Sequence, residues 1–522
     1  PPPPPPPPPP FHDTATTEIY TGCRSSAASD VYKRQALGLV LVACEKEDDP
    51  DITAPSIEVT SPQMGSNVTG SADVTIEGEV SSDTVRVEVT QIIDATGVET
   101  IFDANLSGTS FTADLTLGDN ANTVSTMAAD GVGNSTLLRF TLFYPALALT
   151  NGMSASYVIG QNTFNANDPN QGGNVAGNTL SGPLGTLVEW RNTRLYIPDT
   201  GNHRVLGFNE VPTASNVSAN FAIGQDNLTS AIPGTSATDF TSPAGVFVTD
   251  TQFFVADTGN HRVLIWDSLP VNGITAANYV VGQTDFDSAA TGCSATALAG
   301  PSSVFVANDK LVVADNLNQR VLIWNTIPTA NGVAADIVIG QQNFDFCLPN
   351  DSDGDGLTDT LTASTLNNPG GIWTDGAQLL VADTGNNRVL LWTTFPASNG
   401  QAADVVLGQV DMVSAIAQLS QSGLSGPKSV TSNGNQVVIA DSGNARVLIW
   451  NTFPTINQPD ADIVIGQADF TSNTPILGQN TLTTADNVFV DRKNLFVVDG
   501  NRILMFVDPT QPEPTSDQNA NL

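Results

Sequence analysis

Short apolar segments separated by turn residues fill the chain from about residue 52 onward. Between 52 and 146 the segments alternate apolar and polar residues, as in VTIEGEVS and VRVEVTQI. From about 150 they are apolar at successive positions, as in FFVAD and RVLIW. Alternation predicts strands with one buried face, and continuous apolar runs predict strands that are buried on both faces. We therefore expect an all-β chain with two kinds of sheet.

The second region consists of six copies of one unit. Each copy contains an apolar strand, a turn that begins with Asp, and a return strand that begins with Arg. The copies lie 58 residues apart, except for one interval of 68, and their aspartates are Asp199, Asp257, Asp315, Asp383, Asp441 and Asp499. A second apolar block ends in Gly-Gln in every unit, at Gln161, Gln225, Gln283, Gln341, Gln409 and Gln467. A third strand begins after a Pro in five of the units.

The turn Asp-x-Gly-Asn-x-Arg between two strands resembles the NHL repeat. This resemblance covers 150–508 and implies a six-bladed β-propeller with four strands, a to d, in each blade. The a strand follows the Pro, the b strand ends at the Asp, the c strand begins at the Arg, and the d strand precedes Gly-Gln. The Trp residues that end strand c are expected to pack between blades: Trp266, Trp324, Trp392 and Trp450.

The order of the strands predicts how the propeller closes. The region begins with a d strand, 157–161, and ends with a c strand. We therefore expect 157–161 to complete the last blade, 487–507, which would leave no unpaired sheet edge between the two ends.

The region 52–146 resembles bacterial Ig-like domains, which are β-sandwiches. The similarity is carried by LGDN at 117–120, ADG at 129–131 and GN at 133–134. Modules of this kind act as spacers or adhesion units, and we see no candidate catalytic residue in this one.

The N-terminal segments predict export. Residues 1–35 begin with ten prolines and resemble translated adapter sequence, with a natural Pro-rich leader as the alternative, so we exclude them from the fold. ALGLVLVA at 36–43 is too short to span a bilayer and ends at Cys44. The segment resembles a truncated bacterial lipoprotein signal with Cys44 as the lipidated residue, and the alternative is a buried strand with a chance Cys. The acidic tether up to residue 51 resembles surface-export signals of Gram-negative lipoproteins.

Composition excludes some functions. The net charge is −35, with 18 Lys+Arg against 53 Asp+Glu, which excludes most nucleic-acid binding because phosphate requires a basic surface. It also disfavours anionic membrane surfaces, so we expect contact with a membrane only through a lipid anchor. The C-terminal residues 509–522 are expected to be disordered.

We assign no catalytic residue. The Asp and Arg of the repeated turn recur six times, which favours a structural role: the Asp would accept from the turn backbone and pair with the Arg, and Gly201 would adopt a positive φ. His203 and His261 occupy equivalent turn positions in adjacent units, but two imidazoles make a weak metal site. Some NHL-type propellers are lyases or lactonases with axial His residues and a metal, and nothing in this chain matches such a set.

The loops from strand d to the next strand a differ most among the repeats. Two are longer than the rest, 161–183 and 341–369, and lead into opposite blades. In propellers these loops share a face with the b–c turns, which makes that face the expected binding surface. The longer loop contains DSDGDGLTD, which resembles calcium loops of the EF-hand, dockerin and thrombospondin type. The expected ligands of a structural Ca²⁺ are Asp351, Asp353, Asp355, the carbonyl of Leu357, and Asp359. An acidic surface turn is the alternative.

Cys293 and Cys347 lie in consecutive d–a loops. In an exported protein they are expected to form a disulfide, with two separate thiols as the alternative.

These features predict an outer-membrane or cell-surface lipoprotein whose propeller binds a protein or polysaccharide ligand on the face of the d–a loops and b–c turns. A propeller-type lyase or hydrolase with a site at the axial channel is the main alternative, and a purely structural spacer is another.

Overall fold

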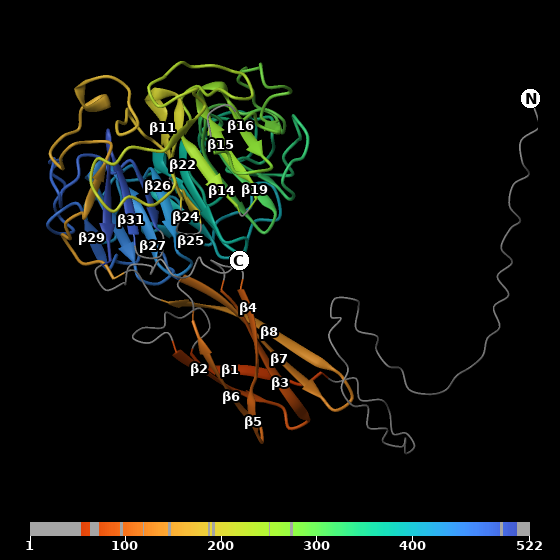
Figure 1. The fold of residues 1–522 in the computed structure, drawn as a ribbon. Helices are drawn as coiled ribbons and strands as arrows, with labels where there is room; N and C mark the ends of the chain where they lie inside the picture. The colour runs from red at the N-terminus through yellow and green to blue at the C-terminus, as the bar shows by residue number, and fades with distance from the viewer. Residues whose placement is uncertain are drawn as a thin grey trace, which may run out of the picture.

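The structure is a computed structural model that describes residues 54–62, 73–93, 98–117, 120–144, 148–185, 188–190, 194–249, 251–271, 275–490 and 494–508. The expected leader 1–35, the segment 36–51 with Cys44, and the tail 509–522 lie outside these residues. The described chain is all-β and contains eight four-stranded antiparallel sheets (Figure 1). The expectation of an all-β protein is confirmed.

The first two sheets belong to the N-terminal region. One has the strand order β1-β2-β6-β5 and the other β4-β3-β7-β8. Buried side chains of both sheets, including Ile76 and Phe111 from one and Val89 and Leu142 from the other, form a common core. The strands are β1 (Ile57–Ser61), β2 (Asp73–Val80), β3 (Thr84–Ile93), β4 (Val98–Asp103), β5 (Asn105–Ser107), β6 (Ser110–Thr116), β7 (Asn120–Asp130) and β8 (Ser135–Tyr144).

Six further sheets follow the repeats, and we number them 1 to 6 along the chain. Each pairs its strands in the order a-b-c-d, as the sequence predicts. Sheets 1 to 3 contain β10 (Val188–Trp190), β11 (Arg194–Asp199), β12 (Arg204–Phe208), β13 (Phe221–Ile223); β14 (Gly245–Val248), β15 (Phe253–Asp257), β16 (Arg262–Trp266), β17 (Tyr279–Val281); and β18 (Pro301–Ala307), β19 (Lys310–Asp315), β20 (Arg320–Trp324), β21 (Ile337–Ile339).

Sheets 4 to 6 repeat the same arrangement. They contain β22 (Pro369–Thr374), β23 (Leu379–Asp383), β24 (Arg388–Trp392), β25 (Val405–Leu407); β26 (Ser429–Ser432), β27 (Val437–Asp441), β28 (Arg446–Trp450), β29 (Ile463–Ile465); and β30 (Asn487–Val490), β31 (Asn494–Asp499), β32 (Arg502–Val507) with β9 (Tyr157–Ile159). The predicted pairing of the 157–161 segment with the last unit is confirmed, because Val158 lies opposite Leu504 in sheet 6.

Six hydrophobic cores lie between consecutive sheets. Strands b and c are buried on both faces because each face packs against a neighbouring sheet. The sixth core joins the last sheet to the first, since Phe496 and Met505 of sheet 6 pack with Leu195 and Phe208 of sheet 1. As expected, the Trp residues that end strand c lie in these cores: Trp266, Trp324, Trp392 and Trp450.

The helical elements of the described residues are single 3₁₀ turns. None of the helices in these ranges is long and apolar enough to cross a membrane. They are η1 (Pro169–Gly172), η2 (Thr200–Asn202), η3 (Thr258–Asn260), η4 (Asn316–Asn318), η5 (Thr384–Asn386) and η6 (Ser442–Asn444).

Candidate functional site

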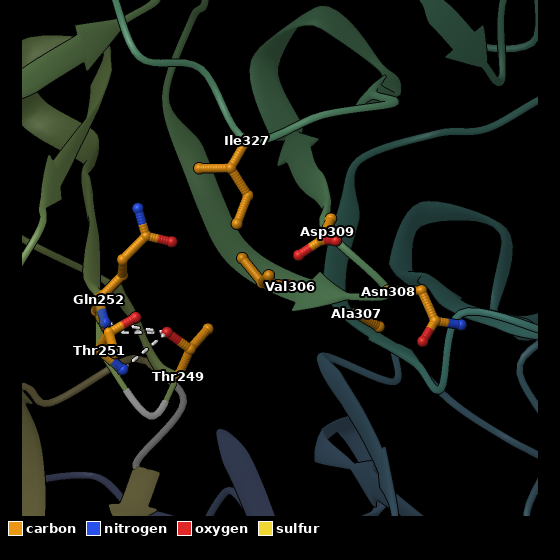
Figure 2. A pocket seen from close by; sticks show the side chains of 8 residues that line it. All are labelled: Thr249, Thr251, Gln252, Val306, Ala307, Asn308, Asp309 and Ile327. Carbon is orange, nitrogen blue, oxygen red and sulfur yellow. Dashed lines mark hydrogen bonds between the residues drawn. The ribbon is translucent and has the colours of Figure 1, made fainter. Parts of the chain in front are cut away.

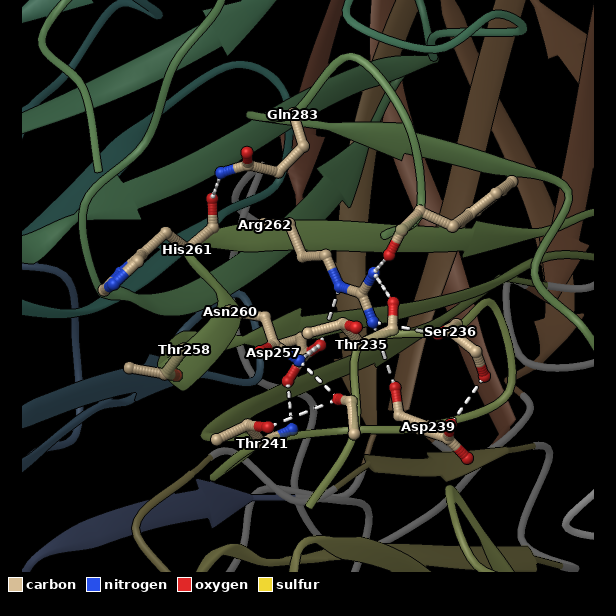
Figure 3. Close-up of polar contacts among 12 residues, drawn as sticks. Thr235, Ser236, Asp239, Thr241, Asp257, Thr258, Asn260, His261, Arg262 and Gln283 are labelled. Carbon is tan, nitrogen blue, oxygen red and sulfur yellow. Dashed lines mark hydrogen bonds and ion pairs between the residues drawn. The ribbon is translucent and has the colours of Figure 1, made fainter. Parts of the chain in front are cut away.

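The repeated Asp and Arg form buried ion pairs, as the sequence predicts. In sheet 2, Arg262 Nε donates to Asp257 Oδ2 at 2.7 Å, and both side chains are fully buried (Figure 3). The same Nε–Oδ2 contact at 2.7–2.8 Å joins four other pairs: Asp199–Arg204, Asp315–Arg320, Asp383–Arg388 and Asp441–Arg446. In the shortened last turn, Arg502 donates to Asp499 Oδ2 from both Nε at 2.9 Å and Nη2 at 2.6 Å. Burying a charge is costly unless it is paired and hydrogen-bonded, so the surroundings of each pair must satisfy the remaining donors.

Backbone carbonyls of two d–a loops satisfy the rest of each guanidinium. Arg262 Nη2 donates to Ser236 O and Asp239 O, both at 3.0 Å, in the loop that enters its own sheet. Its Nη1 donates to Phe286 O in the loop that leaves the sheet. The Arg therefore fixes both loops relative to the b–c turn. Because all six units repeat this arrangement, it is a folding device and not an active site.

The Asp contacts differ from the expectation. Asp257 Oδ1 accepts from the N–H of Thr241, which precedes strand a. From the b–c turn, Asp257 accepts from the side chain of Asn260 instead of the expected backbone N–H. The expected positive φ at Gly201 is also wrong: the left-handed residue is the variable one two positions later, such as His203 with φ 53°. A Cβ at Gly201 would lie 2.7 Å from Ser181 O, which disfavours a side chain in this unit, although Leu317 occupies the equivalent position in sheet 3. A close approach between distant segments therefore favours glycine here.

Burial is the largest influence on the pKa of the aspartate carboxyl in each pair. It raises the pKa of the Asp257 carboxyl to about 6, although Arg262 opposes the effect. Burial likewise raises the pKa of four other carboxyls, those of Asp199, Asp315, Asp383 and Asp441. Burial also acts on the pKa of Asp499, but Arg502 and Thr483 outweigh it and hold this pKa below the ordinary value.

The variable turn residue links neighbouring sheets. His203 Nδ1 accepts from Ser242 N and His261 Nδ1 accepts from Gly300 N, each at 3.0 Å, in the segment before strand a of the next sheet. Gln319, Asn387 and Asn501 offer side-chain oxygens to the same kind of donor. The two histidines are therefore hydrogen-bond acceptors between neighbouring sheets. The sequence analysis missed this role. The signal was present, because His, Gln and Asn at this turn position can all accept a hydrogen bond through a side-chain atom.

This role predicts a pH dependence. Burial lowers the pKa of His203 and His261 below 6.5, and Asp199 partly opposes the effect at His203. As the pH falls below 6.5, the unfolded chain binds protons that the folded chain does not, so the free energy of unfolding decreases until the lowered pKa is reached. Replacing both residues by Asn should flatten this part of the pH profile, because Asn387 already accepts from Gly426 N at 2.8 Å. Thermal melts of both proteins between pH 7.5 and pH 5 measure the difference, and identical pH profiles would contradict the role.

The Gln of each Gly-Gln block holds the start of the d–a loop. Gln225 Nε2 donates to His203 O in the b–c turn and to Ile232 O in the loop, and its Oε1 accepts from Ile232 N. The d–a loops and b–c turns therefore meet at the same end of each sheet. Within the described residues, Gln161 Oε1 and Gln341 Oε1 are buried without a hydrogen-bond partner. These two belong to the long loops, which thus depart from the repeated geometry at their first turn.

Three of the expected calcium ligands lie together. Ligand oxygens of Asp351, Asp353 and Asp359 all lie within 4.8 Å of one another. Asp351 is fully buried and accepts from Gly354 N and Gly356 N. Ser352 donates to Asp359 from its N–H and its hydroxyl and thereby lowers the pKa of this carboxyl.

Asp355 is not part of this cluster, because its carboxylate accepts from Leu357 N at 2.9 Å. The structure therefore gathers the carboxylates of Asp351, Asp353 and Asp359 and leaves that of Asp355 outside. The role of the Leu357 carbonyl stays a prediction.

A disulfide joins Cys293 and Cys347, whose Cα atoms lie 6.3 Å apart. It links the loop that enters sheet 3 to the loop that enters sheet 4, immediately before the acidic segment.

A shallow pocket of about 460 Å³ lies at the opposite end, between sheets 2 and 3 (Figure 2). Among the residues that the structure describes, its lining includes Gln252, Val306, Asn308 and Ile327, and Asp309 is the one carboxylate. None of the residues predicted from the sequence lies there, and the lining contains no His, Cys or Lys. The described lining therefore offers no pair of side chains that could act as a general acid and a general base.

Comparisons with known proteins assign no family to the chain. No family model matches it, and no curated protein matches it in sequence. Among solved structures, a proposed glucose dehydrogenase from Thermus thermophilus is 15% identical over 64% of this chain and 98% of its own, with a TM-score of 0.36. A luciferin-regenerating enzyme is 11% identical over 63% and 92%, with a TM-score of 0.33. A proposed 6-phosphogluconolactonase from Bacteroides uniformis is 13% identical over 71% and 92%, with a TM-score of 0.31. The function must therefore be argued from the chain itself.

Proposed function

We propose that the chain is an exported lipoprotein of a Gram-negative envelope whose six-bladed, NHL-type β-propeller binds a protein or glycan without catalysing a reaction. The blades would be sheets 1 to 6, since each consecutive pair shares a core and β9 completes the last sheet. The sheets of 52–146 would form an Ig-like spacer between this propeller and a lipid on Cys44. A mass spectrum of exported protein with an unmodified Cys44 would contradict the anchor.

One observation carries the binding role: the departures from the repeat lie at one end of the sheets. The two long loops, the acidic cluster and the disulfide all belong to the d–a connections. Most exposed large apolar side chains of the described repeats also lie at this end, among them Ile232, Leu317 and Ile416. Rigid sheets that carry variable loops are typical of binding scaffolds.

The alternative is a lyase or hydrolase with an axial site. Such a site needs titratable groups on the innermost strands, which are the a strands, since those of consecutive sheets contact one another. Five of them, β14, β18, β22, β26 and β30, contain no His, Cys, Asp or Glu. Only β10 carries a carboxylate, Glu189. One acidic residue on these strands supports this alternative poorly.

The binding role can be tested by capture. Immobilised full-length chain is incubated with solubilised envelope proteins and with surface polysaccharides, with and without Ca²⁺. We expect retention of a defined ligand that competes with soluble chain and is recovered chemically unchanged. Recovery of a converted product would favour the enzyme instead, and the absence of any retained ligand would contradict the proposal.

We also propose a structural Ca²⁺ in the loop 351–359. Asp351, Asp353 and Asp359 supply three convergent carboxylates, and Ca²⁺ prefers six to eight oxygen ligands. Nearby backbone carbonyls and water would complete the shell. The ion would order the loop at the proposed binding face.

Calcium is expected to raise the melting temperature modestly, because it binds only the folded loop. Replacing Asp353 and Asp359 together by Asn should abolish this rise, whereas Asp355→Asn should retain most of it, since Asp355 lies outside the cluster. Calorimetry with Ca²⁺ and with Mg²⁺ measures binding and the shift. A wild-type protein that binds no Ca²⁺ would restore the interpretation as an acidic surface turn.

A further inference from the structure

The loop between sheets 4 and 5 exposes an unusual series of aliphatic side chains. Val410, Val413 and Ile416 have exposed fractions of 64%, 66% and 71%, and Leu419 follows at 36%. We call these four residues the aliphatic loop surface. These side chains therefore gain little of the free energy that burial would supply, and a cluster of exposed aliphatic side chains is typical of an interaction surface.

The other repeats supply an internal control for this loop. The backbone is held in the same way in the loop between sheets 4 and 5 and in the loop between sheets 1 and 2. In the first, Ile416 N donates to Gln409 Oε1, and in the second, Ile232 N donates to Gln225 Oε1. The residues with structural roles are also equivalent: Met412 O accepts from Arg388 as Leu228 O accepts from Arg204. The sheets therefore require the backbone of this loop but not its exposed side chains.

Polar residues replace the valines in the equivalent loops. The position of Val410 is occupied by Asp226, Thr284, Gln342 and Ala468. The position of Val413 is occupied by Thr229, Asp287, Asp345 and Thr471. Ile416 corresponds to Ile232, Ala290, Leu348 and Thr474. The positions of Val410 and Val413 are thus polar or small in these four other units and carry a large aliphatic side chain here. This difference indicates a role in binding a partner and not in packing the sheets.

The acidic loop lies beside this surface. Arg388 joins the two, since its Nη1 donates to Met412 O at 2.6 Å and its Nη2 to Thr362 O at 2.9 Å. Asp353 and Asp355 are exposed in that loop, and Leu357 is 64% exposed. Aliphatic and acidic groups therefore lie on the two d–a loops that flank sheet 4, at the same end of that sheet.

We propose that the aliphatic loop surface and the acidic loop together dock a protein segment that carries both aliphatic and basic side chains. The proposal rests on the proposed binding function and specifies its partner. Charge complementarity favours a basic partner. A second copy of the chain would bring the same acidic loop and a net charge of −35, so it would be repelled. An anionic membrane would be repelled for the same reason. The four residues of the aliphatic loop surface include no aromatic side chain on which a sugar ring could stack.

The test uses the full-length chain and two synthetic probes of about 14 residues, one of Leu and Lys and one of Leu and Glu in the same order. Fluorescence anisotropy at physiological ionic strength measures their binding. The test variant is Val410→Thr, Val413→Thr, Ile416→Thr. Other loops already have Thr at the equivalent positions, namely Thr284, Thr229 and Thr474, so the melting temperature of the variant should not fall. The control variant is Val271→Thr, Ile456→Thr, which changes exposed aliphatic residues in c–d connections.

We expect the Lys probe to bind wild type and the control variant equally, and the triple variant at least about tenfold more weakly. Asp355→Asn, which lies outside the proposed Ca²⁺ cluster, should weaken binding and reduce its dependence on salt. Equal binding by the triple variant, or equal binding of the Glu probe, would overturn the inference. If wild type and the control variant formed a concentration-dependent dimer and the triple variant did not, the surface would bind a second copy of the chain, and the inference would be wrong. If wild type and triple variant capture the same envelope ligand equally, the inference fails while the proposed function stands.

Discussion

Replacing Arg262 by Ala is expected to lower the free energy of unfolding by about 3–5 kcal/mol, because the buried carboxylate of Asp257 then loses its partner. The loss also frees the carbonyls of Ser236, Asp239 and Phe286, which anchor two consecutive d–a loops. Equilibrium urea unfolding measures the change. The effect should be larger than for any surface cation, since the Arg262 side chain is fully buried.

Two further variants sharpen this prediction. Arg262→Lys should recover little of the loss, because one ammonium group cannot reproduce the planar fork that reaches both loops. Lys310→Ala removes a partly exposed cation at the start of β19, whose Nζ lies 3.2 Å from Asn325 Oδ1. It should change the free energy of unfolding by less than about 1 kcal/mol. If Arg262→Ala and Lys310→Ala had similar effects, the ion pairs would not be the organising contacts of the repeats.

Deleting residues 150–164 is expected to destabilise the repeat region by about 3–6 kcal/mol, from the burial of Val158 and Ile159 alone. These side chains are 0% and 1% exposed and belong to two different cores, one on each face of sheet 6. The deletion also exposes β32 as an unpaired edge and removes Phe164 O, which accepts from Arg502. Urea unfolding and sedimentation velocity should show lost cooperativity and aggregation.

The matched variant is Val280→Ala, at the position in β17 that corresponds to Val158 in β9. It removes packing in the middle of the region and leaves the chain ends paired, so unfolding should stay cooperative. A deletion variant with unchanged melting would mean that β9 does not hold the last sheet in solution.

The sequence predicted the sheets well, and for a local reason. A strand is specified by its own apolar run and by the turn residues at its ends, and six copies of one unit made the four strands of each sheet recognisable. The order of the strands also predicted the pairing of Tyr157–Ile159 with the last sheet. The pairing of each Asp with its Arg was predictable because the two residues flank one short turn.

The candidate site was only partly predictable. The acidic spacing singled out Asp351, Asp353 and Asp359, but it could not show that Asp355 turns to Leu357 N. The role of His203 could not be read from its own unit either, because its donor, Ser242 N, belongs to the next sheet.

The amino-acid sequence alone thus determined the strands, their order and the pairs that close short turns. The tertiary structure decided the contacts between distant segments: which carbonyls receive the guanidinium of Arg262, which segment approaches Gly201, and which aliphatic residues of the loop after Gln409 face water. The physical reason is that strand formation depends on neighbouring residues, whereas these contacts exist only after separate sheets have packed and brought their loops together.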